Sequence, residues 1–275
     1  VDRRATCGGP AINPAKGNML KKNKIPLLEF DTDRKAVINP GDINPGINGL
    51  PERGVMCFQE ETVRKLKRAG HLKEIYRAHT ICQDYPIYQF IHKGRKLLLF
   101  RPTVGAPIAA GIMEELGVKG CTKWILCGSA GGLDKAHSFG HLIVPKAAVR
   151  DEGFSYHYLP PSREVGASPR AVKAIKKVMA RHGVPYLVSK TWTTDAFFRE
   201  TPQKVALRKK EGCLAVEMEA AAVFAVAKFR GYQAGAILYL HDDVSGKDWD
   251  KRHAHDPSYV REKIFWLAAD ACLGL

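Results

Sequence analysis

A glycine-rich turn follows a short apolar stretch near the middle of the chain. Residues 124–126 resemble a buried strand, and Gly128-Ser129-Ala130-Gly131-Gly132 comes almost directly after it. Such a turn offers backbone N–H groups and a hydroxyl at the carboxyl end of a strand, where α/β proteins bind ligands and where concave amides bind anions. It has neither the lysine of a Walker loop nor the spacing of a dinucleotide site. The turn therefore predicts an anion site, with a purely structural glycine turn as an equal alternative.

Two acidic residues open a strongly apolar stretch, residues 216–229, which we predict to be a helix. At helical spacing Glu219 shares a face with Val216 and Val223, so its carboxylate points toward the core. One inward carboxylate can accept hydrogen bonds from two adjacent hydroxyls, as binding of a vicinal diol requires. The alternative is the preference of acidic residues for the first turn of a helix, which explains Glu217 well and Glu219 less well.

Two further segments bring functional side chains to exposed ends of elements. His241-Asp242-Asp243 follows the apolar strand predicted at residues 236–240. An acid buried there beside a second carboxylate would have a raised pKa, as a general acid requires, and a solvated turn is the alternative. Phe197 and Phe198 interrupt a polar loop, where they could stack on a planar ring or anchor the loop in the core.

The elements that must position these residues alternate along the chain. Apolar strands separated by amphipathic helices are typical of an α/β fold whose sheet is covered on both faces. We predict one domain over residues 25–275, preceded by a basic tail over residues 1–24. Strands are expected at residues 36–39, 87–91, 96–100, 124–126, 141–144, 147–150, 186–188 and 236–240, and helices at 59–77, 106–116, 169–182, 216–229 and 258–273, with Ser168 as a cap.

Composition restricts the class of protein. The 275 residues are 45% hydrophobic and 26% charged, without the run of ~20 apolar residues that a membrane span needs, so fibrous and membrane-spanning classes are excluded. No signal-peptide core is visible. Seven scattered cysteines without a C-x-x-C pair favour a reducing cytoplasm and predict no zinc site or other metal. The net charge of +15 favours anionic partners, but no nucleic-acid-binding motif accompanies it, so nucleic acid is a minor alternative.

In chain order these segments resemble the nucleoside phosphorylase superfamily, which holds purine nucleoside phosphorylases, uridine phosphorylases and methylthioadenosine nucleosidases. Pro40-Gly41-Asp42 is similar to the family's P-G-D turn after the first strand, and Val104-Gly105-Ala106-Pro107 to its G-x-G-x-P turn. Gly128-Ser129-Ala130-Gly131 is similar to its G-S-x-G phosphate turn, Val216-Glu217-Met218-Glu219-Ala220-Ala221 to its V-E-M-E-A-A string, and Asp242 to the acid of its S-D turn. The resemblance covers residues 36–270.

The resemblance implies a three-layer α/β/α fold with a central mixed, twisted sheet, and it implies phosphorolysis. Phosphate attacks the anomeric carbon of a nucleoside through an oxocarbenium-like transition state, and the base departs. Glu219 would then bind the ribose hydroxyls, Met218 would pack on the sugar, and Asp242 would be the catalytic residue that protonates or hydrogen-bonds the base at N7. The other implied contacts are with the nucleoside for Phe197, Glu217, Val104 and Thr103, and with phosphate for Gly41, Gly128 and Ser129.

The same resemblance implies the partners of the protein. We expect a small nucleoside as substrate, inorganic phosphate as co-substrate and no organic cofactor. We also expect a cytoplasmic homo-oligomer, which could be a dimer, trimer or hexamer. Asp242 is a purine-type feature and Ser155-Tyr156-His157 a uridine-type one, so the expected preference is purine-leaning or broad. For His157, Trp249 and Trp266 themselves, packing is the expected role.

Three positions depart from the family pattern. Cys127 stands where an arginine usually precedes the G-S-x-G turn, Ile43-Asn44-Pro45 where a second follows P-G-D, and Gln83 where a third would cross a subunit interface. Candidates to replace them are Arg53, Arg101 and Arg150. Without replacement, water would be the nucleophile of a nucleosidase, or the protein would be a non-catalytic nucleoside-binding relative. No carboxylate base for a water nucleophile stands out in the sequence, which favours phosphorolysis.

Overall fold

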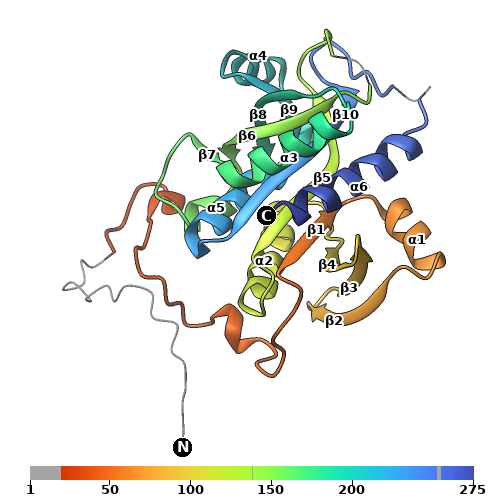
Figure 1. The fold of residues 1–275 in the computed structure, drawn as a ribbon. Helices are drawn as coiled ribbons and strands as arrows, with labels where there is room; N and C mark the ends of the chain where they lie inside the picture. Colours follow the sequence, from red (N-terminus) through yellow and green to blue (C-terminus); the bar gives the residue numbers. More distant parts are fainter. Residues whose placement is uncertain (1–19, 138, 253–254) are drawn as a thin grey trace, which may run out of the picture.

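A ten-stranded mixed sheet with helices on both faces forms the body of the molecule (Figure 1). The structure is a computed structural model that describes residues 20–137, 139–252 and 255–275. The strands are β1 (Arg53–Cys57), β2 (Lys73–His79), β3 (Asp84–His92), β4 (Arg95–Phe100), β5 (Lys123–Gly132), β6 (Leu142–Asp151), β7 (Glu164–Gly166), β8 (Leu187–Thr194), β9 (Cys213–Glu217) and β10 (Gln233–Asp243). The helices are α1 (Glu60–Arg68), α2 (Ala106–Val118), α3 (Pro169–Arg181), α4 (Pro202–Lys210), α5 (Ala220–Arg230) and α6 (Ser258–Leu273), with short 3-10 helices η1 (Pro26–Leu28), η2 (Pro40–Asp42), η3 (Phe154–His157) and η4 (Phe197–Arg199).

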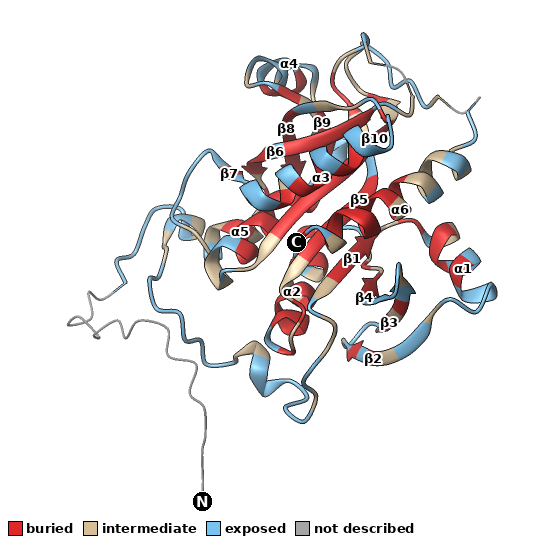
Figure 2. Cartoon of the chain, viewed as in Figure 1, coloured by how far each residue is buried: buried red, intermediate tan, exposed pale blue. Residues whose placement is uncertain are grey.

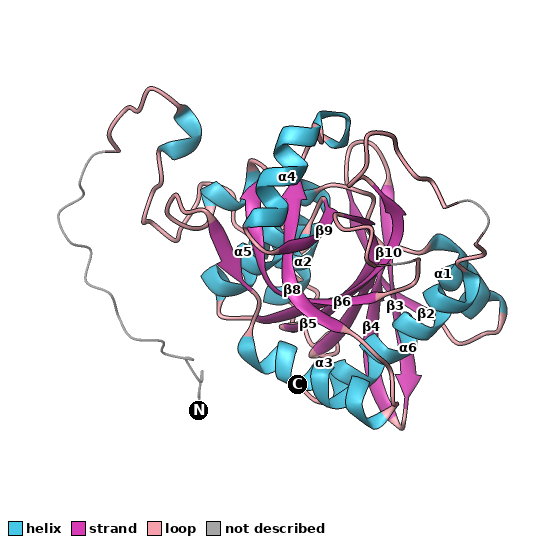
Figure 3. Ribbon diagram, turned by 90° about the horizontal axis from the view of Figure 1, so that it is seen from above, coloured by secondary structure: helices cyan, strands magenta, loops and turns pink. Residues whose placement is uncertain are grey.

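Five of the strands close into a ring (Figure 3). β10 pairs with β5 in parallel and with β6 antiparallel, while β8 joins β6 to β9 and β9 returns to β5. β1, β4, β3 and β2 extend the sheet outward from β5. Since β5 runs parallel to both β1 and β10, the carboxyl ends of these three strands meet at one edge. That edge is where an α/β protein binds its ligand.

Alternate residues of the central strands supply two separate cores. Met56 and Trp124 belong to the core with α2 and α5, whereas Val55 and Ile125 belong to the core with α1, α3 and α6. The alternation follows from the two-residue period of a strand. Buried residues accordingly fill the strands and the inner helix faces (Figure 2). The predicted three-layer α/β/α fold with a mixed, twisted sheet is confirmed.

Several predicted elements have their expected places. β3 and β4 form the predicted hairpin, and α6 spans residues 258–273 as expected. α3 begins at Pro169, but the side chain of Ser168 does not cap it. Instead, the Ser168 hydroxyl oxygen accepts a hydrogen bond from the Ala234 N–H at 2.9 Å and ties α3 to β10.

Three predicted elements are wrong in extent or type. The helix expected over 59–77 ends at Arg68, because Gly70 turns the chain at φ +71°, and residues 73–79 pair with β3 as β2. The helix expected over 216–229 begins only at Ala220, since Val216 is part of β9. No strand forms at residues 36–39, and Val37 and Ile38 are exposed there.

The segment before β1 lies on the surface and is fastened to the body by a few contacts. The Lys119 ammonium donates to the carbonyl oxygens of Ile43 and Asn44 at 2.6 and 3.0 Å, and the Asn44 amide donates to the Tyr76 hydroxyl at 2.8 Å. The predicted tail over residues 1–24 falls mostly outside the described residues. Across the described residues, none of the helices is long and apolar enough to cross a membrane.

A buried carboxylate joins the β3–β4 hairpin, α3 and α6. Asp270 on α6 has a side chain that is only 4% exposed, and it accepts hydrogen bonds from four basic side chains. Against the cost of burial, these donors hold the pKa of Asp270 well below its usual range. The donors are His92 at 2.7 Å, Lys93 at 2.5 Å, Arg181 at 2.6 Å and His182 at 2.7 Å.

We predict that Asp270→Asn lowers the free energy of unfolding by about 3 kcal/mol near neutral pH, because it leaves a half-buried basic cluster without its counter-charge. Since the folded pKa of Asp270 is depressed, the difference from wild type is present above the ordinary value of 3.8 and shrinks as the pH falls below it. Urea unfolding at several pH values measures it. The matched control is Asp84→Asn, an exposed partner of Arg77 and His79, for which the loss stays below about 1 kcal/mol. Equal losses for both variants would contradict the role given to Asp270.

Candidate active site

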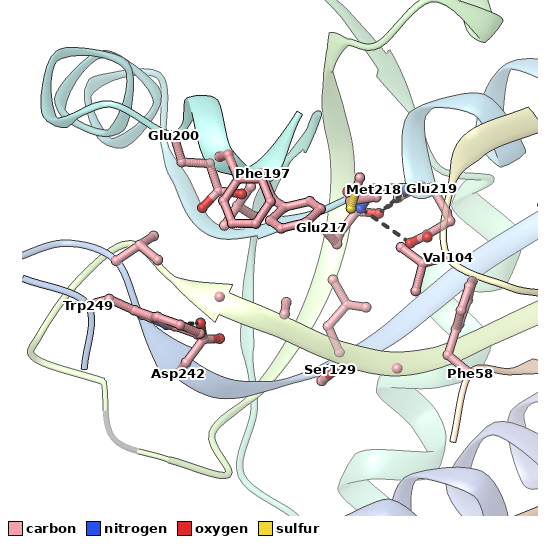
Figure 4. A pocket seen from close by; sticks show the side chains of 18 of the residues that line it. Phe58, Val104, Ser129, Phe197, Glu200, Glu217, Met218, Glu219, Asp242 and Trp249 are labelled. Carbon is pink, nitrogen blue, oxygen red and sulfur yellow. Dashed lines mark hydrogen bonds between the residues drawn. The ribbon is translucent and has the colours of Figure 1, made fainter. Parts of the chain in front are cut away.

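A cavity of about 500 Å³ opens at the carboxyl edge of the sheet (Figure 4). Its walls come from β5, from the turn between β9 and α5, from the end of β10 with the loop after it, and from η4. The residues expected at the site that line it are Val104, Gly128, Ser129, Phe197, Glu217, Met218, Glu219 and Asp242, and Phe58, Glu200, Lys247 and Trp249 line it as well.

Glu219 occupies the residue before the first turn of α5 and turns its carboxyl group inward. It accepts hydrogen bonds from the Gly105 N–H at 2.6 Å and the Met218 N–H at 3.2 Å. Gly105 has φ +118°, a conformation that favours glycine, and this lets the backbone present its N–H to the carboxylate. Burial and then the charge of Glu217 raise the pKa of Glu219 to about 8. The expected inward direction is correct, but its cause is this turn and not a helix face shared with Val216.

Glu217 is a structural carboxylate at the amino end of α5. It accepts hydrogen bonds from the hydroxyls of Thr191 and Thr193 on β8 and from the backbone N–H groups of Glu219 and Ala220. The Glu217 carboxylate satisfies N–H donors that a helix start leaves unpaired, and it places a negative charge where the helix dipole favours it. Burial raises the pKa of Glu217 and these hydrogen bonds oppose the rise. Glu217 therefore shapes the turn that positions Glu219.

The glycine segment is not the turn that the sequence suggested. Residues 128–132 continue β5, with Ser129 paired to Tyr239 and Gly131 to Val216. The glycines are needed for close packing, since a Cβ on Gly131 would lie 2.9 Å from Val216 Cγ1. The exposed Ser129 lies beside Tyr239 in the sheet, and the Tyr239 hydroxyl accepts a hydrogen bond from Arg261 Nε at 3.1 Å.

At the outer end of the cavity Asp242 accepts a hydrogen bond from the indole of Trp249. Trp249 Nε1 donates to Asp242 Oδ2 at 2.6 Å (Figure 4). Trp249 is 60% exposed and lines the cavity, so the expectation that it serves packing is wrong. The loop carrying Trp249 returns to the sheet, because Asp250 pairs with Asp243.

Glu200 is a site residue that sequence reasoning missed. It directly follows η4, the short helix that contains Phe197 and Phe198. Its side chain lines the cavity near Asp242. Burial and the charge of Asp242 raise its pKa to about 7. The available signal was an acid two residues after a pair of aromatic residues in a loop. Those rings are 52% and 88% exposed, which fits a stacking surface and excludes an anchor in the core.

Other expected residues lie elsewhere. Gly41 belongs to η2 in the surface segment and does not line the cavity, because the strand expected before it does not exist. The turn after the real first strand begins at Phe58, against which Gly128 packs. Thr103 does not line the cavity either, and its hydroxyl bonds the Tyr85 hydroxyl at 3.1 Å. His157 is exposed and lies outside the cavity.

Two of the arginines offered as phosphate ligands are engaged in other contacts. Arg53 begins β1, at the opposite end of the strand from the cavity, and pairs with Glu52 at 2.8 Å. Arg150 is buried, and its guanidinium donates to four oxygens, those of Ser155, Leu159, Pro160 and Ser162. Arg101 follows β4 at the correct edge but does not line the cavity. Among the described lining residues, Lys247 is the only cation.

The described residues contain no cluster of three or more His, Cys, Asp or Glu side chains arranged to hold a metal ion. The polar groups of the described residues that line the cavity are carboxyls, the Lys247 ammonium, one serine hydroxyl, one indole N–H and backbone amides. Such groups suit a neutral polyhydroxy ligand with a planar ring. They bind it through hydrogen bonds and stacking.

A sequence profile described as the phosphorylase superfamily matches residues 52–263. The chain belongs to this superfamily. It is 32% identical over 166 residues to a guanosine phosphorylase of Halorubrum lacusprofundi, covering 59% of this chain and 67% of that protein. A uridine phosphorylase structure from Vibrio fischeri has a TM-score of 0.67 at 25% identity, over 82% of this chain and 91% of the other. An AMP nucleosidase structure from Bacteroides thetaiotaomicron has a TM-score of 0.64 at 22% identity, over 81% and 87%, and supports the fold alone.

The relatives in the phosphorylase superfamily indicate the class of activity with which the cavity can be compared. The relatives include phosphorylases of guanosine and uridine, so at the family level this chain is related to nucleoside phosphorylases. The superfamily match begins at residue 52, just before β1. The surface segment with Gly41 lies outside it, in agreement with the place of β1 as the first strand.

The two glutamates at the start of α5 are predicted to differ in their effects on folding. Glu217→Ala removes the acceptor of four hydrogen bonds and lowers the free energy of unfolding by about 3 kcal/mol or more. Glu219→Gln lowers it by only about 1 kcal/mol, since an amide has the same shape, its oxygen keeps the shorter bond from the Gly105 N–H, and only the 3.2 Å bond from Met218 loses its acceptor. Denaturant unfolding of both variants measures the difference. A larger loss for Glu219→Gln than for Glu217→Ala would contradict these roles.

Proposed function

We propose that the protein cleaves the N-glycosidic bond of nucleosides by phosphorolysis, with a purine-leaning or broad preference, giving a free base and ribose 1-phosphate. The observation that carries this is the inward Glu219 carboxyl group, which shares one cavity with Ser129 and Asp242. The cavity of about 500 Å³ falls in the range of pockets that hold small organic ligands.

The sugar end of the cavity is formed by Glu219 and Met218. Hydroxyls that donate to a carboxylate favour its charged form, so the 2′- and 3′-hydroxyls of ribose would lower the raised pKa of Glu219 on binding. The resulting anion would stand beside the ribosyl group as it gains positive charge in the transition state. Fixed charge at that point is electrostatic preorganisation, and Met218 supplies an apolar surface for the ring.

The nucleophile would be held at the Gly128–Ser129 segment of β5. Arg261 donates a hydrogen bond to the hydroxyl of Tyr239, the strand partner of Ser129. Its guanidinium would supply part of the positive charge that the family's usual arginines provide. Phosphate is therefore expected to bind with fewer charge-assisted contacts than in relatives that keep those arginines.

The base would lie at the outer end, against Phe197, with Asp242 hydrogen-bonding or protonating N7. The exposed rings of Phe197 and Phe198, 4.1 Å apart between centroids, offer an aromatic surface for stacking. Water as nucleophile is the second candidate, favoured by one observation. Apart from Lys247 no cation lines the described part of the cavity, so bound phosphate receives little direct charge.

The test is a kinetic panel of inosine, adenosine, guanosine and uridine with and without phosphate, with the sugar product identified. We expect turnover of at least one purine nucleoside that depends on phosphate and yields ribose 1-phosphate. Turnover of uridine alone would contradict the purine preference. Equal turnover without phosphate, yielding free ribose, would contradict phosphorolysis and support the nucleosidase.

The contribution of Arg261 is predicted to appear in the KM for phosphate. Arg261→Gln removes the charge next to the Tyr239 hydroxyl, and we expect that KM to rise about 3- to 10-fold while the KM for the nucleoside stays constant. Lys263→Gln on the same helix is the matched control, with both KM values unchanged. An Arg261→Gln enzyme with an unaltered phosphate KM would exclude Arg261 from the anion site.

We further propose a cytoplasmic homo-oligomer, supported by apolar side chains at the surface outside the cavity. Val37 and Ile81 are fully exposed, and Ile38 is 74% exposed. Exposed apolar side chains of this size are candidates for a contact with a second copy of the chain. Light scattering on the purified protein measures the state, and a monomer at micromolar concentration would contradict the proposal.

A further inference from the structure

Glu200 and Asp242 both line the outer end of the cavity, and among the described residues only Asp242 of these two has a side-chain partner. Asp242 Oδ2 accepts the Trp249 indole N–H at 2.6 Å. The Glu200 side chain makes no hydrogen bond or ion pair with any residue that the structure describes. The Glu200 side chain nevertheless points into the candidate active-site cavity and lies opposite Asp242 in the close view (Figure 4). A half-buried carboxyl group without a protein partner indicates a role toward a ligand.

We propose that Glu200 carries the proton that the departing base takes up, while Asp242 remains the acceptor held by the Trp249 indole. This assignment rests on the proposed function and divides its acid–base work between two residues. The Trp249 N–H occupies one oxygen of Asp242, so Asp242 acts as an acceptor at that position. The negative charge of Asp242 in turn keeps a proton on its neighbour.

The electrostatic surroundings of Glu200 support this division. Burial and the charge of Asp242 raise the pKa of Glu200 to about 7, close to the value at which a general acid works best near neutral pH. Among the described lining residues, the charged groups at the inner end of the cavity are carboxyl groups, and the one cation, Lys247, lies on the exposed loop after β10. The charged groups that share the cavity or the loop with Glu200 are Asp242, Lys247, Asp248, Glu217, Glu219 and Arg199.

The proton transfer balances without any further reactant. As the C1′–N9 bond breaks, its electron pair stays on N9, and the proton moves from the Glu200 carboxyl oxygen to N7 of the purine. The base leaves as a neutral N7–H tautomer, and a phosphate oxygen bonds to C1′. Glu200 remains as a carboxylate and regains a proton from water, which reaches it because Phe198 and Trp249 beside it are exposed.

The decisive experiment is the pH dependence of kcat/KM for a purine nucleoside. In the wild type we expect a bell-shaped profile, because Glu219 must lose a proton to bind the sugar and Glu200 must keep one, and kcat/KM falls tenfold for each pH unit on the alkaline side. Glu200→Gln should lose this alkaline limb and be slower by about 10²- to 10⁴-fold at pH 6. Asp242→Asn should move the limb to lower pH, because it removes a charge that raises the pKa of Glu200. Glu262→Gln, an exposed glutamate on α6, is the control with an unaltered profile.

A second substrate separates proton donation from a structural role. 4-Nitrophenyl β-D-ribofuranoside releases a stable phenolate and needs no proton, so Glu200→Gln should cleave it within about threefold of the wild-type rate. Equal slowing of this substrate and of the purine nucleoside would assign Glu200 to the structure of the site and overturn the proposal. An alkaline limb that persists in Glu200→Gln and vanishes in Asp242→Asn would assign the proton to Asp242.

These outcomes are distinct from failure of the proposed function. A wild-type enzyme that cleaves no riboside overturns the function, and the role of Glu200 falls with it. A wild-type enzyme that cleaves ribosides while Glu200→Gln keeps the same limb overturns the role of Glu200 alone.

Discussion

A buried carboxylate at the amino end of α5 determines the geometry of the site. Glu217 binds two threonine hydroxyls of β8 and two backbone N–H groups of the turn, so a strand and a helix start share one acceptor. These bonds fix the turn in the one conformation that directs Glu219 toward Gly105 and the cavity. The negative charge that stabilises the helix start also contributes to the raised pKa of Glu219. Local folding and ligand affinity thus depend on the same interaction.

The closed ring of strands brings this turn to the end of β5. Because β9 pairs antiparallel with β5, Val216 lies beside Gly131, and the glutamates that follow it reach the edge where β5 and β10 end. That close approach leaves no room for a side chain on Gly131. The glycines of β5 therefore serve the packing of two strands, and the shape of the cavity depends on their lack of Cβ atoms.

The sequence predicts the layers of the fold and most of the residues that line the cavity. It mispredicts the boundary between β9 and α5 and the segment around Gly41. Hydrophobic periodicity locates α6 and the β3–β4 hairpin, since each buries one regular face. It fails at residues 213–219, where a strand enters a helix with no break in the apolar pattern. It fails at Gly41 because a Pro-Gly turn can form without a strand before it. Glu200 and Trp249 carry no local pattern, and only the arrangement of two loops brings them to Asp242.

The charge of the cavity differs from that of the chain. The protein carries a net charge of +15, yet the lining holds five acidic residues, Glu200, Glu217, Glu219, Asp242 and Asp248, against Lys247. Buried acids that lie close together cannot all be ionised, so protons are retained on Glu219 and Glu200, whose pKa values rise to about 8 and 7. Retained protons make these groups hydrogen-bond donors as well as acceptors near neutral pH. A cavity of this kind can bind the hydroxyls of a sugar and the nitrogens of a base, while the basic surface attracts the anion that the reaction consumes.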